Sequence, residues 1–291
     1  MPLYRLTYRN YDGQARSRFR WRTIVAQDLR VLFSKRMFLL TVLAGELTFI
    51  FFLFRIMSHD VIRTNPTNPI AIAFRNMSML DVNSKTFFDF VRLQSTMVFF
   101  LTIYAGASMI ADDFRNNLMD VYFSKPLRWY DYVSGKIITL LLLSLSQTAV
   151  PGVMLVVFHN LFAPSMERLH ATWWFVGAIT EFSILMSVPC ALAMLACSSL
   201  FRRGADASVA FVLIVVLNAI AGSIMQDLLK VPNYGLVSAL DAVNYLGESM
   251  FSLRHHIYTL HWTIPAACIA IFSLLCLWVV CRRVKRAEVA S

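Results

Sequence analysis

Six long apolar segments, separated by shorter polar connections, dominate the chain. They cover residues 37–57, 91–111, 133–158, 172–200, 207–225 and 262–281. A helix needs about 20 mainly apolar residues to cross a bilayer, because it rises about 1.5 Å per residue and the hydrocarbon core is about 30 Å thick. Each segment is long enough for one crossing. The pattern therefore predicts an all-α polytopic membrane protein with a six-helix transmembrane domain over residues 37–281.

Residues 18–36, just before the first apolar segment, show a different pattern. Apolar side chains recur there at helical spacing, at Trp21, Ile24, Val25, Leu29, Leu32 and Phe33. Most polar side chains fall elsewhere on the helical wheel, at Arg20, Arg22, Gln27, Asp28 and Arg30. Cationic amphipathic helices lie in the membrane interface. We predict an interfacial helix over 18–36 that leads into the first span; the alternative is a helix packed on a soluble partner.

The positive charge is unevenly distributed between the connections. Most of the 27 Lys and Arg residues lie in segments 1–36, 112–136, 201–206 and 282–291. Cytoplasmic connections of membrane proteins are enriched in Lys and Arg. We therefore expect a multi-pass protein of the cytoplasmic (inner) membrane, with cytoplasmic tails at 1–17 and 282–291. The net charge of +10 would meet membrane lipid headgroups. Nucleic acid is not expected as a partner, because no soluble domain is left to bind it.

The connection between the second and third spans contains a short helical pattern. Asp112 or Asp113 can cap a helix, and Pro126 disfavours helical geometry in the residue before it. An apolar face follows at helical spacing, formed by Phe114, Leu118, Val121 and Tyr122. We predict a short helix over Asp112–Phe123. It can transmit force from a soluble partner, or it can be an ordinary connection.

The same connection resembles the permeases of type-2 ATP-binding-cassette (ABC) transporters. These share an acidic residue ending span two, a short helix, a proline–arginine element and a Gly-Lys pair opening span three. The matching positions here are Asp112 or Asp113, Pro126, Leu127, Arg128, Gly135 and Lys136. The usual Gly-Thr of the family is replaced by Asn116-Asn117. The layout is also similar, with an amphipathic lead-in, six spans and a long outer segment before span six.

This resemblance implies the membrane-spanning permease subunit of an ABC exporter. Such a subunit pairs with a second permease subunit, identical or different, and with two copies of an ABC ATPase subunit. An accessory protein is a further partner that the resemblance leaves open. The short helix would be the coupling helix, with ATPase contacts at Asp112, Asp113, Phe114, Arg115, Asn116, Asn117, Leu118 and Met119. The outer segment 226–261 would dip into the membrane as re-entrant helices; the alternative is a surface loop.

Two carboxylates lie inside predicted spans. Glu46 and Glu181 each lie about 14 Å deep by helical rise. A charge at that depth costs at least about 3 kcal/mol, so each is a candidate functional residue. The resemblance places span one at the subunit interface, where Gly45 would permit close helix approach. Glu46, Gln94 and Asn218 are therefore predicted to line the substrate pathway or that interface. The alternative is structural, with either glutamate hydrogen-bonded to Gln94, Ser144, Gln147 or Asn218.

Sequence signatures of catalysis are missing. The chain has no G-x-x-x-x-G-K-[ST] phosphate loop and no H-E-x-x-H motif. Its five cysteines lack metal-ligand spacing. We therefore predict no catalytic residue, cofactor or metal ligand, with ATP hydrolysed by a partner subunit. Two other functions remain open: a force-transmitting or anchoring ABC complex without a transported substrate, and a polytopic membrane enzyme that uses Glu46 and Glu181.

Overall fold

The computed structural model describes residues 19–64, 82–124, 127–161, 166–253, 258 and 260–290. Regular secondary structure in these ranges is entirely helical. The helices are α1 (Trp21–Phe33), α2 (Arg36–Thr64), α4 (Ser84–Arg115), α5 (Leu118–Phe123), α6 (Trp129–Gln147), α7 (Ala149–Leu161), α8 (Met166–Thr172), α9 (Trp174–Leu200), α10 (Gly204–Leu229), the 3-10 helix η2 (Pro232–Val237), α11 (Ala239–Met250) and α12 (Thr263–Ala290).

Six helical segments are long and apolar enough to cross a membrane, which confirms the predicted fold class. They are Arg36–His59, Ser84–Arg115, Trp129–Leu161, Leu169–Leu200, Gly204–Leu229 and Thr263–Glu288. The third segment combines α6 and α7, which meet at Thr148. Pro151 follows that junction and has no N–H to continue the hydrogen-bond ladder. The chain is thus an all-α, multi-pass membrane protein.

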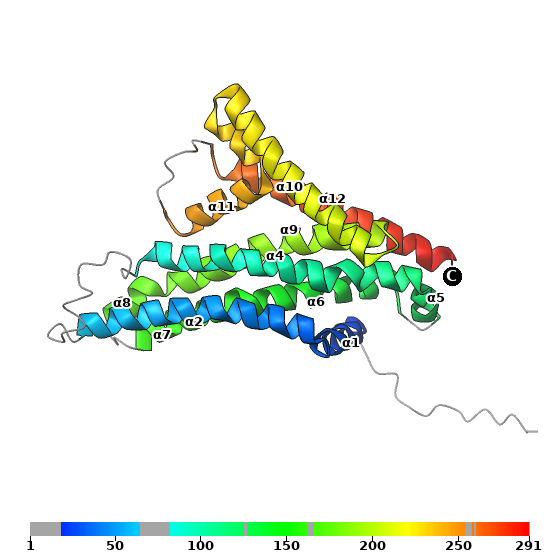
Figure 1. The fold of residues 1–291 in the computed structure, drawn as a ribbon, viewed down its shortest axis with the longest axis horizontal. Coiled ribbons are helices and arrows are strands. Elements are labelled where there is room, and N and C mark those ends of the chain that lie inside the picture. Colours follow the sequence, from blue (N-terminus) through cyan, green and yellow to red (C-terminus); the bar gives the residue numbers. More distant parts are fainter. Residues whose placement is uncertain are drawn as a thin grey trace, which may run out of the picture.

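The long helices α2, α4, α6 with α7, and α9 run side by side as a bundle (Figure 1). Its core near α5 includes the fully buried Tyr132, Ile110 and Leu140. Its core at the other end is aromatic, with Phe87 and Phe90 among its members. The C-terminus, α1 and α5 lie at one end of the bundle, called the α5 end below (Figure 1).

Helices α10 and α12 pack against α9 but lean away from the bundle toward α11 (Figure 1). Helix α10 buries only Ala207, Phe211 and Gly222. Its other side chains are mostly large and apolar, and Leu213 and Leu217 are exposed. An apolar face exposed in this way suits a lipid environment, because acyl chains are as apolar as leucine.

The outer segment folds back on the bundle as two short helices. Gly247 of α11 lies so close to α9 that an added Cβ would be 2.5 Å from the ring of Phe182. The amide group of Asn218 on α10 binds the junction of η2 and α11, accepting from the Ala239 N–H at 2.6 Å and donating to the Val237 carbonyl at 3.1 Å. No spanning helix lies between α10 and α12 in the described part of the segment, and its depth in a membrane stays a prediction.

The connection between the second and third spans differs from the predicted single helix. Helix α4 continues to Arg115, and the chain then turns through Asn116 and Asn117 before the six-residue α5. Asn117 adopts a left-handed conformation with φ of 53°, which asparagine tolerates better than most residues. The prediction was therefore wrong about the helix start. Pro126 lies outside the described residues.

Candidate functional site

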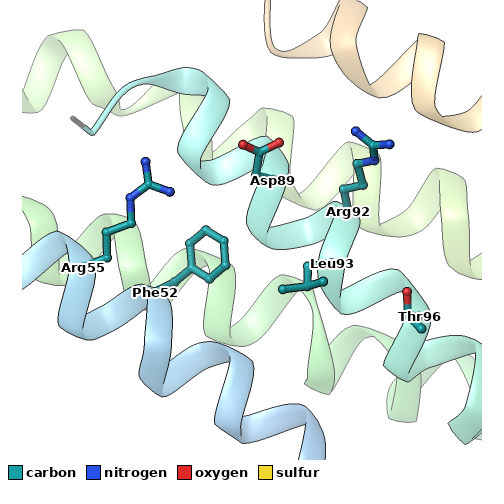
Figure 2. A pocket seen from close by; sticks show the side chains of 6 residues that line it. All are labelled: Phe52, Arg55, Asp89, Arg92, Leu93 and Thr96. Carbon is teal, nitrogen blue, oxygen red and sulfur yellow. The ribbon is translucent and has the colours of Figure 1, made fainter. Parts of the chain in front are cut away.

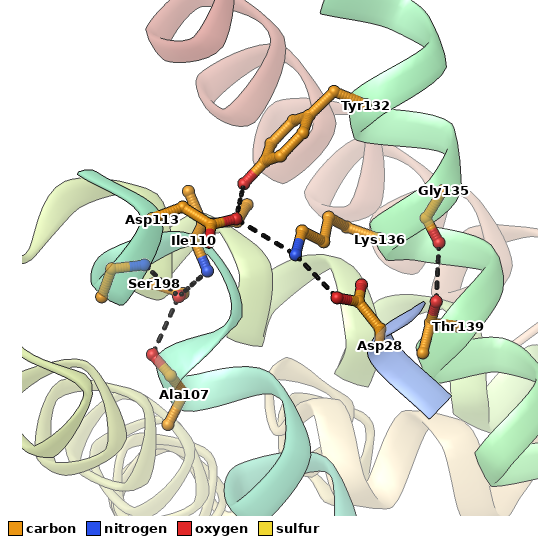
Figure 3. Close-up of polar contacts among 10 residues, drawn as sticks. Asp28, Ala107, Ile110, Asp113, Tyr132, Gly135, Lys136, Thr139 and Ser198 are labelled. Atoms are coloured by element: carbon orange, nitrogen blue, oxygen red, sulfur yellow. Dashed lines mark hydrogen bonds and ion pairs between the residues drawn. The ribbon is translucent and has the colours of Figure 1, made fainter. Parts of the chain in front are cut away.

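A buried ionic network joins α1, α4 and α6 at the α5 end. The Lys136 ammonium lies 3.1 Å from the carboxylate of Asp28 and 3.1 Å from that of Asp113. The Tyr132 hydroxyl donates a hydrogen bond of 2.6 Å to the same Asp113 oxygen. Figure 3 shows Lys136 between the two carboxylates. Asp28, Asp113, Tyr132 and Lys136 are called the ionic network below.

Three of these side chains are shielded from solvent. Tyr132 is fully buried, Lys136 is 2% exposed and Asp113 is 7% exposed. Buried charges are stable only when they are paired and hydrogen-bonded. Each charged group here has an oppositely charged partner on another helix, although the second carboxylate oxygen of Asp28 is buried without a hydrogen-bond partner among the described residues.

Glycine at position 135 permits α1 to reach the network. A Cβ added at Gly135 would lie 2.9 Å from Cβ of Ile24 and 3.3 Å from the Trp21 carbonyl oxygen. Both atoms belong to α1, and neither is the mobile end of a side chain. A larger residue would push α1 away and separate Asp28 from Lys136. The Gly-Lys pair therefore has a local role: the glycine admits α1 and the lysine binds it.

Ser198 of α9 anchors the end of α4 one turn before Asp113. Its hydroxyl accepts hydrogen bonds of 3.1 Å from the N–H groups of Ile110 and Ala111, and donates one of 2.8 Å to the Ala107 carbonyl (Figure 3). The serine is fully buried. These bonds tie the main chain of α4 to α9 and so help to position Asp113.

One ammonium group faces two carboxylates, so the network carries a negative excess. Burial raises the pKa of the Asp28 carboxyl above its usual value, the attraction of Lys136 opposes this shift, and the charge of Asp113 adds to it. On α5, burial and then the charge of Asp113 raise the pKa of the Tyr122 hydroxyl. The charges of the network therefore shift the pKa of its own member Asp28 on α1 and that of Tyr122 on α5.

Aromatic contacts connect α5 with the ionic network. The rings of Tyr122 and Phe123 lie 5.7 and 6.5 Å from the ring of Tyr132, measured between centroids. From α12, the Arg283 guanidinium lies 5.4 Å from the ring centre of Phe114, at the end of α4. A displacement of α5 would therefore act on Tyr132 and, through it, on Asp113.

The predicted ATPase-contact residues divide into an outer and an inner set. Arg115, Asn116 and Asn117 are exposed, and Asp112, Phe114 and Leu118 are half-buried. Their contact with an ATPase stays a prediction. Asp113 and Met119 face the protein interior, so these two are unsuitable as partner contacts in this structure. Val121, a member of the predicted apolar face, is 53% exposed.

A second polar cluster lies inside the membrane-spanning bundle. The Gln147 amide donates to the Glu46 carboxylate at 3.2 Å, and the Gln94 amide donates to the Gly45 carbonyl at 3.2 Å and contacts the Gln147 carbonyl oxygen at 3.5 Å. Gln94 is fully buried, and its own carbonyl oxygen has no hydrogen-bond partner among the described residues. Glu46 and Gln94 therefore lie in one cluster through Gln147 and Gly45, as in the structural alternative. A role in the substrate pathway or at a subunit interface stays a prediction.

Gly45 permits close helix approach, but the approaching group belongs to the same chain. A Cβ at Gly45 would lie 2.1 Å from the Gln147 side-chain oxygen. The contact made by this glycine is thus internal to the subunit. Asn218 binds the outer segment instead of this cluster. Glu181 is exposed on α9, and no hydrogen bond of its side chain is found among the described residues.

Sequence reasoning missed the pairing of Asp28 and the role of Tyr132. Asp28 was assigned to the polar side of α1, yet it points toward Lys136 (Figure 3). The charge of Asp28 was the available signal, because Asp28 is the only acidic residue in the basic segment 18–36. No group of three or more His, Cys, Asp and Glu side chains that could hold a metal ion occurs within the described ranges.

Comparison with known proteins adds no identity. No protein-family model matches the chain, and no curated protein matches it with statistical significance.

Proposed function

We propose that this protein is the membrane-spanning permease subunit of an ABC exporter, driven by a separate ATPase. The observation that carries the proposal is the coupling of a short, partly exposed helix, α5, to the ionic network. Force applied to α5 would reach Tyr132 through its aromatic contacts. It would then reach α4 through Asp113 and α1 through Lys136 and Asp28.

The proposed orientation places the α5 end on the cytoplasmic side of the inner membrane. It is supported by the concentration of Lys and Arg in segments 1–36, 112–136, 201–206 and 282–291, because cytoplasmic connections are enriched in these residues. The ATPase would bind the exposed turn Arg115–Asn117 and the outer face of α5. A second permease subunit would complete the pathway, and the resemblance to type-2 permeases supports that partner.

The membrane-enzyme alternative gains no support from the two intramembrane glutamates. Glu46 binds Gln147, whereas Glu181 is exposed on another helix. No hydrogen bond between the two carboxylates is found among the described residues.

The proposal is tested by purifying the tagged protein from its natural host and measuring ATP hydrolysis and the co-purified chains. The wild type should retain an ATPase subunit with a phosphate-binding loop. Asn116→Arg combined with Val121→Arg should remove that subunit and lower hydrolysis at least tenfold, because both side chains are exposed at the proposed contact.

Val231→Arg is the matched control, because Val231 is also exposed. It lies just after the C-terminal end of α10, whereas the N-terminal end of α10, at Gly204, is the one that contacts α4 at Ser108. It should leave hydrolysis unchanged. Absence of an ATPase from the wild-type preparation would overturn the proposal, and so would unchanged hydrolysis in the double variant.

A further inference from the structure

A pocket of about 370 Å³ opens between α2 and α4, away from the α5 end. It is lined by Phe52 and Arg55 of α2 and by Asp89, Arg92, Leu93 and Thr96 of α4. Figure 2 shows the Asp89 carboxylate between the two guanidinium groups, with Phe52 and Leu93 along the other edge. These six residues are called the arginine pocket below.

The depth of the arginine pocket follows from the two helices that form it. At about 1.5 Å per residue, Arg92 lies about 31 Å from Asp113 along α4, and Arg55 about 28 Å from Arg36 along α2. The hydrocarbon core of a bilayer is about 30 Å thick. If Asp113 and Arg36 mark one membrane surface, both arginines therefore lie at the headgroup level of the opposite surface.

The charges of the arginine pocket suit a phosphate group. Two guanidinium groups and one carboxylate leave one net positive charge. Guanidinium is a planar donor that binds phosphate oxygens in pairs. Arg92 is exposed, and no side-chain hydrogen bond or ion pair of Arg92 is found within the described part of the chain. Arg55 lies over the Phe52 ring at 6.0 Å from its centre, so Phe52 supports its position.

An apolar track leads from the arginine pocket toward the membrane centre. Leu93 is 51% exposed and Phe100, two turns deeper on the same helix, is 54% exposed. Residues at this spacing lie on one face of a helix, and Thr96 lies between them on that face. The pocket thus combines a phosphate-binding rim with an exposed apolar path that an acyl chain can follow.

We propose that the arginine pocket binds an anionic phospholipid in the leaflet opposite the α5 end. Arg55 and Arg92 hold the phosphodiester, and Phe52, Leu93 and Phe100 contact an acyl chain. The net positive charge matches a phosphodiester headgroup without an amine, and Asp89 accepts a hydrogen bond from a headgroup hydroxyl. A phosphatidylglycerol-type lipid has this chemistry. The site does not depend on the proposed transport function.

The test is lipid titration of the purified full-length protein in detergent, followed by native mass spectrometry. Phosphatidylglycerol should bind at least fivefold more tightly than phosphatidylethanolamine, because the ammonium of the latter cancels the charge match. Arg55→Gln with Arg92→Gln should weaken phosphatidylglycerol binding about tenfold or more, since it removes charge-assisted hydrogen bonds. Arg92→Gln alone, at an exposed position, should weaken it at least threefold.

Lys85→Gln is the control, because Lys85 is exposed on α4 but does not line the pocket. It should change binding less than twofold. Thermal unfolding of each variant checks that it is folded. If the double variant is not folded, the single variant Arg92→Gln decides the result. Equal loss from Lys85→Gln would overturn the site, as would equal affinity for both lipids or competition by millimolar inorganic phosphate.

Discussion

At the residue scale, the central feature is one buried ammonium shared by two carboxylates. Lys136 is the only cation of the ionic network, and it holds Asp28 and Asp113 from two other helices. Removing one member of a buried ion pair typically costs about 3–5 kcal/mol, because the remaining charge stays buried without a partner. Replacing every charged member by a neutral group of similar shape costs much less.

Lys136→Met should therefore lower the free energy of unfolding by about 3–5 kcal/mol, because both carboxylates lose their cation. Thermal unfolding of the protein in detergent measures this loss. Combining Lys136→Met with Asp28→Asn and Asp113→Asn should recover most of it. Arg115→Met, at an exposed site on the same helix as Asp113, is the control and should change stability by less than about 0.5 kcal/mol. A triple variant less stable than the single one would contradict an ionic role for the network.

At the element scale, α1 is part of the folded bundle and packs directly on α6. Its residues Ile24, Val25 and Leu32 are buried, and its backbone passes close to Gly135. The helix was expected to lie in the membrane interface, and its packing on α6 is compatible with that position. An interfacial helix bound in this way would pass its own movements to the start of the third span.

Gly135→Ala should lower the free energy of unfolding by about 1–3 kcal/mol, the usual cost of overpacking. The new Cβ would meet Ile24 and the main chain of Trp21. Thermal unfolding in detergent measures the effect. Gly177→Ala on α9 is a matched control, because nothing lies within 4 Å of its added Cβ. It should be neutral or stabilising by up to about 1 kcal/mol, and equal losses in the two variants would rule out close packing of α1 as the cause.

At the scale of the whole molecule, the proposed function depends on which membrane surface the α5 end faces. Both termini and α5 are proposed to be cytoplasmic, because an ATPase can reach them only there. The same orientation would place the arginine pocket in the outer leaflet. One topology measurement therefore bears on both proposals.

Single cysteines should report this orientation after the five native cysteines are replaced by alanine. Asn10→Cys and Lys285→Cys should be protected from an impermeant thiol reagent in intact cells, and both should react after permeabilisation. Asn65→Cys should react in intact cells, because it follows the first span. The reverse labelling pattern would overturn the cytoplasmic assignment of α5 and with it the proposed ATPase contact.

The number and type of the spanning elements were predictable from the sequence, because a lipid solvent requires each crossing to be a long, apolar helix. All six were found. The polar residues Glu46, Gln94 and Gln147 were also recognisable in the sequence, because each interrupts an apolar segment. The pairing of Gln147 with Glu46, however, depends on how α2 and α6 meet.

The ionic network was decided by the tertiary structure alone. Asp28, Asp113 and Lys136 lie in three separate helices. The packing of α1 over Gly135 brings Asp28 to Lys136, and the packing of α4 against α6 brings Asp113 there. Local periodicity describes one helix at a time, so it placed Asp28 on the polar side of an interfacial helix and left Asp113, like Asp112, as a candidate helix cap. Hydrophobic length determined the spans of this protein, whereas contacts between distant helices decided which of its charged residues are buried partners.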